Sequence, residues 1–407
     1  MKEITKGVCA PKGFLAGGIR CGIKESSQKK DLALIYSRKI CNAAAVFTTN
    51  RVRAASVQVS QEHIAGGKLC AVIANSGNAN ACTGQAGMSA ARRMAHLVAD
   101  VFSIDPSQVA VASTGVIGVP LPISAIEKSI GALKASLRDD EQGHDDALEA
   151  IMTTDTRKKE IAVEITIGGK PVRIGAMVKG SGMIHPNMAT MLAFITTDAA
   201  IESGALDASL RRAVKRSFNR LTVDGDTSTN DMALIMANGE AGNPPVTAGC
   251  ADYEIFSDAL EYVCAALARK MARDGEGATK LVTVTVSGAG SEEAAEALAK
   301  SVASSSLVKA ACFGADANWG RVLCALGYAG VDFVPEKTGV RFLSGAGEIE
   351  VCRNGESVPF SEGKAKLILS EEEIEILVNL NGGDAKASAW GCDLTYDYVK
   401  INGDYRS

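Results

Sequence analysis

Two adjacent segments near the middle of the chain alternate between apolar and polar residues with the period of a β-strand. Their apolar positions are Ile161, Val163, Ile165, Ile167, Val172, Ile174 and Ala176. Gly168 and Gly169 separate the two segments, and paired glycines adopt the backbone angles of a tight turn without steric cost. The pattern therefore predicts an antiparallel hairpin over 161–176, so at least part of the fold is a sheet.

Helical spacing recurs on both sides of this hairpin. Apolar residues at intervals of three or four positions predict helices over 86–102, 206–221 and 256–271. Short apolar runs predict strands at 69–74, 109–119 and 281–286. Glycine-rich turns join these segments, and the sequence contains no internal repeat and no linker. We therefore expect an α/β (α+β) chain in which helices pack on sheets in layers.

Charge and composition narrow the kind of partner. The chain has 43 basic and 47 acidic residues in mixed order. A protein that binds nucleic acid usually has an excess of basic residues clustered on one surface, and this sequence shows no such cluster. No run approaches the roughly eighteen apolar residues of a membrane span, and the N-terminus lacks the apolar core of a signal peptide. We expect a cytoplasmic protein that binds small molecules, without nucleic acid or membrane as a partner.

Cysteine and histidine usage argues against a metal site. The 11 cysteines are scattered, odd in number and never spaced as C-x-x-C, and the chain has 4 histidines. The sequence also lacks the phosphate-binding motifs G-x-x-x-x-G-K-[ST] and, after a strand, G-x-G-x-x-G. We therefore predict that the protein holds neither a metal ion nor a bound cofactor.

Thr190 lies between a glycine-rich polar turn and a run that alternates like a strand. A threonine hydroxyl needs a neighbouring base to act as a nucleophile, and one solution uses the residue's own α-amine. Cleavage after Ala189 would free that amine, whose ordinary pKa of about 7.7–8.0 leaves a usable fraction unprotonated near neutrality. The same pattern also fits an ordinary strand threonine, so the local residues leave both interpretations open.

Acyl transfer also needs donors that stabilise an oxyanion. In the apolar run 109–119, Thr114 supplies a hydroxyl, and Gly115 allows a close approach to its backbone N–H. The two residues are therefore candidates for an oxyanion hole. A plain strand end followed by a tight turn explains the same residues, and on the local pattern alone it is the favoured interpretation.

Three further positions suit an amino-acid substrate. Lys179 could bind a carboxylate, Glu276 an ammonium group, and Thr153 could supply a hydroxyl. Each also fits a solvated loop residue. His185 is a second candidate base, ranked below the α-amine because a loop histidine is more often merely exposed.

These residues belong to motifs that run in order along nearly the whole chain. They include STGVIG at 113–118, IMTTDT at 151–156, KGSGMIHPNMATML at 179–192, GDTSTNDM at 225–232 and DGEGATK at 274–280. The series resembles the glutamate N-acetyltransferases, also called ornithine acetyltransferases, of arginine biosynthesis. The resemblance implies a helix–sheet–sheet–helix sandwich, self-cleaved into an α chain of 1–189 and a β chain of 190–407 that share one core. It also implies a smaller C-terminal subdomain from about 285 to 400.

The resemblance implies a role for each site residue. Thr190 would be both the cleavage site, after Ala189, and the acyl carrier, with Thr114 and Gly115 as the oxyanion hole. The implied substrate-binding positions are Thr153, Lys179, Thr190, Glu276, Asn402 and Ser407. The implied reaction moves the acetyl group of N2-acetyl-L-ornithine to L-glutamate in an α2β2 heterotetramer, and it leaves open whether acetyl-CoA also donates.

Two other functions remain open at this point. An N-terminal-nucleophile amidase or aminopeptidase would use the same self-activated threonine, but it would pass acetyl groups to water even when glutamate is abundant. An uncleaved amino-acid-binding protein would run as one full-length band and would transfer no acetyl group. The fate of the acetyl group and the length of the chain separate the three functions.

Overall fold

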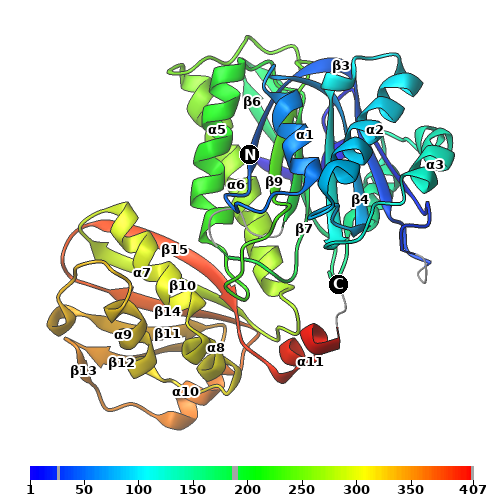
Figure 1. Cartoon of the computed structure of the whole chain (residues 1–407). Helices are drawn as coiled ribbons and strands as arrows, with labels where there is room; N and C mark the ends of the chain where they lie inside the picture. Colours follow the sequence, from blue (N-terminus) through cyan, green and yellow to red (C-terminus); the bar gives the residue numbers. More distant parts are fainter. Residues whose placement is uncertain (25–27, 186–190, 405–407) are drawn as a thin grey trace.

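The computed structural model describes residues 1–24, 28–185 and 191–404. It has a larger lobe built on a nine-stranded sheet and a C-terminal lobe built on a six-stranded sheet (Figure 1). The larger sheet has the order β1-β6-β7-β8-β9-β3-β4-β5, and β2 pairs with β3 beside this path. Its strands are β1 (Lys2–Ile4), β2 (Phe14–Ile19), β3 (Leu32–Phe47), β4 (Lys68–Asn78), β5 (Val109–Val116), β6 (Lys159–Ile167), β7 (Lys170–Lys179), β8 (Leu192–Thr197) and β9 (Met232–Ala237).

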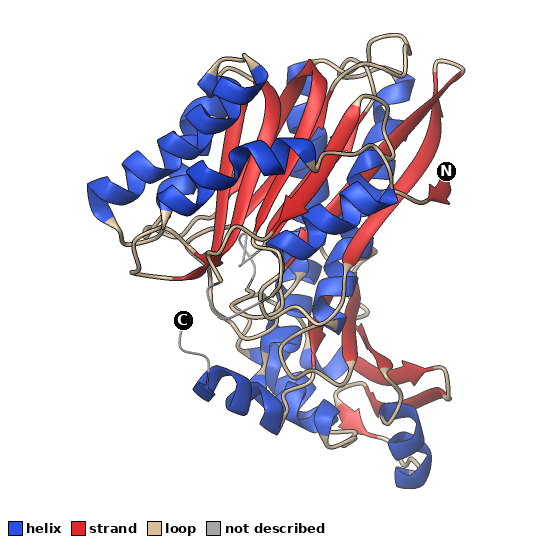
Figure 2. Ribbon diagram, turned by 90° about the vertical axis from the view of Figure 1, so that its right-hand side faces the viewer, coloured by secondary structure: helices blue, strands red, loops and turns tan. Residues whose placement is uncertain are grey.

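The long strand β3 belongs to both halves of this sheet. Its first part pairs with β2 and β4, and after a register shift between Tyr36 and Cys41 its last residues pair with β9. One buried cluster contains residues of both halves, including Ile35 of β3 and Phe194 of β8, so the two halves face each other. Helices cover the outer faces (Figure 2). The expected layering of helix, sheet, sheet and helix is confirmed, with both sheet layers formed by one folded-over sheet.

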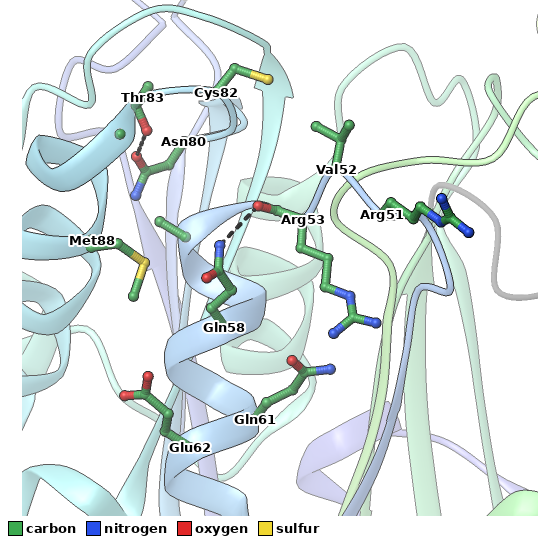
Figure 3. A pocket seen from close by; sticks show the side chains of 12 residues that line it. Arg51, Val52, Arg53, Gln58, Gln61, Glu62, Asn80, Cys82, Thr83 and Met88 are labelled. Carbon is green, nitrogen blue, oxygen red and sulfur yellow. Dashed lines mark hydrogen bonds between the residues drawn. The ribbon is translucent and has the colours of Figure 1, made fainter.

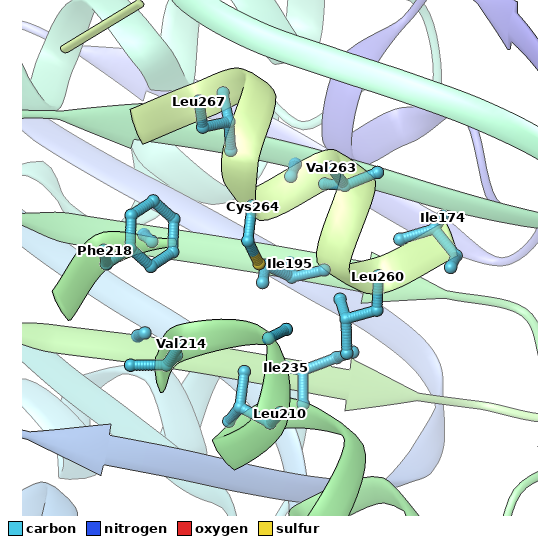
Figure 4. Packing of buried hydrophobic residues seen from close by; sticks show 14 of the residues in the cluster. Ile174, Ile195, Leu210, Val214, Phe218, Ile235, Leu260, Val263, Cys264 and Leu267 are labelled. Carbon is cyan, nitrogen blue, oxygen red and sulfur yellow. The ribbon is translucent and has the colours of Figure 1, made fainter. Parts of the chain in front are cut away.

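The two outer faces carry different helices. The face formed by β3, β4 and β5 packs against α1 (Ala55–Ile64), α2 (Gly84–Phe102) and α3 (Ile123–Ala135). The opposite face packs against α5 (Ser203–Arg216) and α6 (Ala251–Arg273), and Figure 4 shows Leu210 and Leu260 of these helices beside Ile235 of β9. Helix α4 (Glu141–Ile151) contributes to the inner cluster instead.

Most predicted elements are found where the periodicity placed them. The hairpin is formed by β6 and β7, with Ile167 opposite Lys170. The helix predicted over 206–221 is wrong at its end, because α5 stops at Arg216 and Ser217 takes non-helical angles of φ −128° and ψ −87°. A 3₁₀ turn, η3 (Phe218–Arg220), follows. Phe218 still packs in the same buried cluster as the apolar residues of α5. Its helical spacing in the sequence therefore reflects burial and not a continuous helix.

The C-terminal lobe has the strand order β13-β12-β11-β14-β10-β15. Its strands are β10 (Leu281–Ala289), β11 (Gly339–Ser344), β12 (Gly347–Arg353), β13 (Glu356–Ser357), β14 (Glu373–Asn379) and β15 (Ala385–Cys392). Its helices are α7 (Glu292–Ser304), α8 (Ser306–Phe313), α9 (Trp319–Gly327) and α10 (Glu362–Leu369), and α11 (Tyr396–Asp404) follows the last strand. The remaining 3₁₀ turns are η1 (Gly7–Cys9), η2 (Pro106–Gln108) and η4 (Pro335–Lys337).

Two further features bear on the expectations from sequence. None of the helices in the described ranges is both long and apolar enough to cross a membrane. All 11 cysteines are free thiols. The division of the chain between Ala189 and Thr190 stays a prediction, because both residues lie outside the described ranges.

Candidate active site

A cavity of about 250 Å³ brings together side chains from distant parts of the chain. The predicted site residues that line it are Thr114, Gly115, Thr153, Lys179, Glu276 and Asn402. They come from the ends of β5 and β7, from the segment after α4, from the loop after α6 and from α11. The other predicted site residues, Ala189, Thr190 and Ser407, lie outside the described residues.

Thr114 and Gly115 end strand β5, beside the parallel strand β4. The register places Gly77 opposite Gly115, where the backbone has a φ of 127°. A Cβ atom at Gly115 would lie 2.5 Å from the carbonyl carbon of Gly77 and 2.6 Å from the backbone nitrogen of Asn78. Only glycine therefore fits at this position, both for its backbone angle and for its space.

Lys179 ends strand β7 and places its ammonium group inside the site. Its side chain is 3% exposed, and Nζ donates to Thr153 Oγ1 (2.9 Å) and to Thr114 Oγ1 (3.4 Å). Burial lowers the pKa of Lys179, while Asp155, 3.9 Å from Nζ, acts in the opposite direction. The ammonium group and the two hydroxyls form a polar wall of the kind that binds a carboxylate.

A buried ionic network lies behind this wall. Lys159 Nζ lies 2.6 Å from Asp155 Oδ1 and 2.5 Å from Asp274 Oδ2. Asp155 Oδ1 also accepts a hydrogen bond of 2.7 Å from the backbone N–H of Gly180, next to Lys179. Burial alone would raise the pKa of Asp155, but Lys179 and Lys159 outweigh it and hold the pKa below its ordinary value. The network thus fixes the end of β7 that carries Lys179.

Replacing Lys159, the cation that Asp155 and Asp274 share, should lower the stability of the protein. Lys159→Met leaves two buried carboxylates without their shared partner, so we expect a loss of about 3–5 kcal/mol in the free energy of unfolding. The control is Lys158→Met, because Lys158 forms an ion pair of 2.7 Å with Asp145 whose side chains are 42% and 33% exposed. That pair should contribute at most about 1 kcal/mol. Urea unfolding in a Thr190→Ala background, where the chain should stay whole, measures both, and equal losses would contradict the buried-network account.

Glu276 and Asn402 form another part of the cavity wall. The backbone N–H of Glu276 donates to Ser181 O (2.9 Å), and its carboxylate accepts a hydrogen bond of 2.9 Å from Asn402 Nδ2. A Cβ atom at Gly182 would lie 2.2 Å from Glu276 Oε2, so the missing side chain leaves room for this carboxylate. The cavity therefore offers an anion as well as a cation to a substrate with both charges.

Sequence reasoning missed several residues of this site. Ser228, Thr229 and Asn230 line the cavity, but the motif GDTSTNDM has neither helical nor strand period, so it carried no prediction of a role. The candidate base His185 is described but is not among the lining residues. Its Nδ1 lies 3.3 Å from Thr222 Oγ1, and burial lowers its pKa.

A larger cavity of about 1030 Å³ lies between α1 and α2 (Figure 3). Arg51 and Arg53 line it together with Asn80 and Cys82, and none of the predicted site residues does. Size alone therefore does not identify the candidate active site. The smaller cavity is the better candidate because its hydroxyls, ammonium group and carboxylate converge on one space.

One set of three side chains among the described residues lies close enough together to coordinate a metal ion. Ligand atoms of His144, Asp145 and Glu160 lie within 4.8 Å of one another, and none of these residues lines the 250 Å³ cavity. The backbone N–H of Val8 donates to His144 Nδ1 (3.2 Å), and Nε2 contacts the Glu160 carboxylate. Both ring nitrogens thus already join α4 to neighbouring segments.

Comparison with known proteins gives consistent matches over this chain. The model of the ArgJ family matches residues 15–407. The arginine biosynthesis bifunctional protein ArgJ of Symbiobacterium thermophilum is 54% identical, with 100% of both chains covered. The protein of the same name from Caldanaerobacter subterraneus subsp. tengcongensis is 51% identical over 98% of each chain. A crystal structure of the arginine biosynthesis bifunctional protein argJ from Bacillus halodurans is 47% identical with a TM-score of 0.50, covering 52% of this chain and 98% of that chain.

Proposed function

The chain belongs to the ArgJ family, and we propose that it is an acetyltransferase of arginine biosynthesis that moves an acetyl group from N2-acetyl-L-ornithine to L-glutamate. The products are L-ornithine and N-acetyl-L-glutamate. The observation that carries the proposal is the 250 Å³ cavity, which joins two candidate oxyanion donors, a buried ammonium group and a carboxylate. This volume suits a ligand of the size of an acetylated amino acid.

Thr190 becomes the nucleophile when its own peptide bond is cleaved. Thr190 Oγ attacks the carbonyl carbon of Ala189, the carbon–nitrogen bond breaks, and the hydroxyl proton passes to the nitrogen. Water then hydrolyses the ester to give fragments of 189 and 218 residues. The Bacillus halodurans structure supports this step, because its chain is matched over 98% of its own length yet spans 52% of this chain, as one cleavage fragment would.

The free amine of Thr190 then serves as the base for acetyl transfer. It takes the Oγ proton as Oγ attacks the acetyl carbonyl carbon of N2-acetyl-L-ornithine, and Thr114 and Gly115 donate hydrogen bonds to the oxyanion. Collapse of the intermediate returns the proton to the departing amine of L-ornithine and leaves an acetyl ester on Thr190. The amine of L-glutamate attacks this ester and regenerates Thr190, which completes a ping-pong cycle. No step uses a metal ion or a bound cofactor.

We assign the substrate groups by the charges of the cavity. Lys179 binds the α-carboxylate that both amino acids share, and Glu276 binds the side-chain ammonium group of ornithine. Thr153, Asn402 and the terminal Ser407 complete the binding positions.

Glu276→Gln tests the assignment of the ornithine ammonium group. The amide keeps the shape and removes the charge, so we expect the KM for N2-acetyl-L-ornithine to rise about tenfold, because a hydrogen bond to a charged group contributes about 1.5–3 kcal/mol. The KM for L-glutamate is the internal control and should change less than about twofold. Unchanged ornithine release at low N2-acetyl-L-ornithine would remove Glu276 from this role.

The fate of the acetyl group tests the proposal against the amidase alternative. With labelled N2-acetyl-L-ornithine and abundant L-glutamate, we expect the label in N-acetyl-L-glutamate, whereas label in free acetate would indicate an amidase. An uncleaved binding protein would give neither product. Adding labelled acetyl-CoA in place of N2-acetyl-L-ornithine shows whether this chain accepts a second donor.

We assign the cleaved enzyme to the cytoplasm and to an α2β2 heterotetramer. The two fragments share the folded-over sheet, since β8 and β9 follow the cleavage site while their neighbours β7 and β3 precede it. The fragments should therefore stay together after cleavage. Light scattering of the purified enzyme should give twice the mass of the full chain, and a mass equal to one chain would contradict the tetramer.

A further inference from the structure

Residues 228–231 form a short turn directly before strand β9. Hydrogen bonds from this turn reach two other parts of the proposed site. One is the end of β5, which carries Thr114 and Gly115, and the other is Met191, which directly precedes β8. The turn therefore connects, through hydrogen bonds, the strand that carries the oxyanion donors to the segment that follows the nucleophile in the sequence.

Asn230 reaches toward the end of β5. It is 5% exposed, and its Nδ2 donates to Ser113 O (2.7 Å) and to Ala79 O (2.7 Å). The Ser113 carbonyl belongs to the same planar peptide group as the N–H of Thr114, so this hydrogen bond fixes the plane of that group. Asn230 thus holds the backbone at the candidate oxyanion hole.

Asp231 is fully buried and reaches toward β8. Its Oδ1 accepts a hydrogen bond of 2.9 Å from the backbone N–H of Met191. That nitrogen is bonded to the carbonyl carbon of Thr190, so a single hydrogen bond joins Asp231 to the peptide group that follows the nucleophile. The N–H of Met232 also donates to Met191 O (3.0 Å), so Met191 is held through both of its backbone polar groups.

The turn itself is fixed by the residue after strand β3. The backbone N–H of Thr48 donates to Asp231 O (3.1 Å), and the Thr48 hydroxyl donates to Ser228 O (2.6 Å). These two hydrogen bonds fix the backbone of the turn, so they also fix the points from which the side chains of Asn230 and Asp231 extend. Precise placement of reacting groups requires such support from residues that do not react themselves.

Burying the carboxyl group of Asp231 costs free energy, so we expect the carboxyl group at this position to make an interaction that offsets the cost. Within the described ranges Oδ2 takes part in no hydrogen bond of ordinary geometry, although the hydroxyls of Thr48 and Ser228 lie beside the carboxyl group. Burial raises the pKa of Asp231 well above its ordinary value, which favours the neutral acid, and the Met191 N–H opposes this shift. An apolar residue would avoid the desolvation cost but would leave the Met191 N–H without its acceptor.

We infer that Asn230 and Asp231 are positioning residues, which together set the separation between the oxyanion donors on β5 and Met191, the residue that follows the proposed nucleophile in the sequence. The inference rests on the proposed function. Neither residue needs to contact a reacting atom, because each acts through a backbone group. Loss of either side chain should therefore lower kcat while the substrate contacts of Lys179 and Glu276 remain.

Three variants test this inference. Asp231→Ala removes the acceptor for Met191, Asp231→Asn keeps an acceptor oxygen without the acid, and Asp226→Ala is the control at an exposed aspartate of the same loop. We expect Asp231→Ala to slow self-cleavage and to lower the kcat of the cleaved enzyme by about 10²-fold, the cost of a misplacement of about 1 Å. The KM for N2-acetyl-L-ornithine should stay within about threefold, Asp231→Asn should keep kcat within about tenfold, and Asp226→Ala should match the wild type.

Intact masses at timed intervals after a short induction give the cleavage rate, and steady-state kinetics per cleaved chain give kcat and KM. Wild-type rates in Asp231→Ala would overturn the inference. So would an Asp231→Asn enzyme as impaired as Asp231→Ala at an unchanged unfolding temperature. If Asp231→Ala does not fold, Asn230→Ala replaces it, and a raised KM at unchanged kcat there would contradict positioning. A wild-type chain that neither cleaves nor transfers acetyl would instead defeat the proposed function.

Discussion

Thr190→Ala should remain a single full-length chain and should lose acetyl transfer by at least about 10⁴-fold, because the proposed mechanism uses one hydroxyl as the nucleophile in both reactions. Self-cleavage should stop because no Oγ is present to attack the Ala189 carbonyl carbon. Without cleavage the α-amine stays in a peptide bond and cannot act as a base. Intact-mass measurement and the transfer of labelled acetyl to L-glutamate test the two losses separately.

Thr190→Ser is the matched control for this variant. Serine supplies a hydroxyl at the same position and lacks only the methyl group, so both cleavage and transfer should remain measurable. Two fragments from Thr190→Ala would show that another group performs the cleavage. Full acetyl transfer by an uncleaved Thr190→Ala chain would remove Thr190 as the acyl carrier.

Gly115→Ala should lower turnover by about 10²–10³-fold, the usual cost of losing one oxyanion donor. The added Cβ atom would lie 2.5 Å from the carbonyl carbon of Gly77, so the end of β5 must move away from β4. The backbone N–H of Gly115 would move with it. Steady-state kinetics with N2-acetyl-L-ornithine should show the loss mainly in kcat, because the proposed substrate contacts of Lys179 and Glu276 are unchanged.

Gly118→Ala separates this clash from the strain of the backbone angle. Gly118 also has a positive φ, of 81°, but a Cβ atom there would have no neighbour within 4 Å. We expect a small loss of stability and near-normal turnover from this variant. Equal losses of turnover in the two variants would contradict the role of the β4–β5 contact at Gly115.

Local periodicity predicted most of the elements, but their pairing in the sheet depends on distant residues. The alternation on either side of Gly168 and Gly169 identified the hairpin of β6 and β7, because both strands and their turn lie within one short segment. The division of β3 was not predicted. Its register shift between Tyr36 and Cys41 accompanies the change to pairing with β9, about 190 positions further along the chain.

Six of the predicted site residues line the 250 Å³ cavity, but the residues that support them were not predicted. The local pattern made Gly115 and Lys179 candidates only, and the resemblance of the motifs STGVIG and KGSGMIHPNMATML to the acetyltransferase family gave them roles. The burial of Lys179 depends on Asp155, and the partner of Asp155 is Lys159, which in turn contacts Asp274. Such a chain of contacts crosses several segments, so no single motif reveals it. Asp231 was missed for the same reason, because its hydrogen-bond partner Met191 lies 40 positions away.

The acetyl ester on Thr190 is the intermediate that links the two half-reactions, so trapping it is a direct test of the mechanism. Wild-type enzyme incubated with N2-acetyl-L-ornithine and without L-glutamate should accumulate the ester, since the second half of the ping-pong cycle has no acceptor. Mass spectrometry should then find one acetyl group on the fragment that begins Thr-Met-Leu-Ala, and added L-glutamate should remove it. A fragment that carries no acetyl group while L-ornithine is released, or an acetyl group on another residue, would contradict the account.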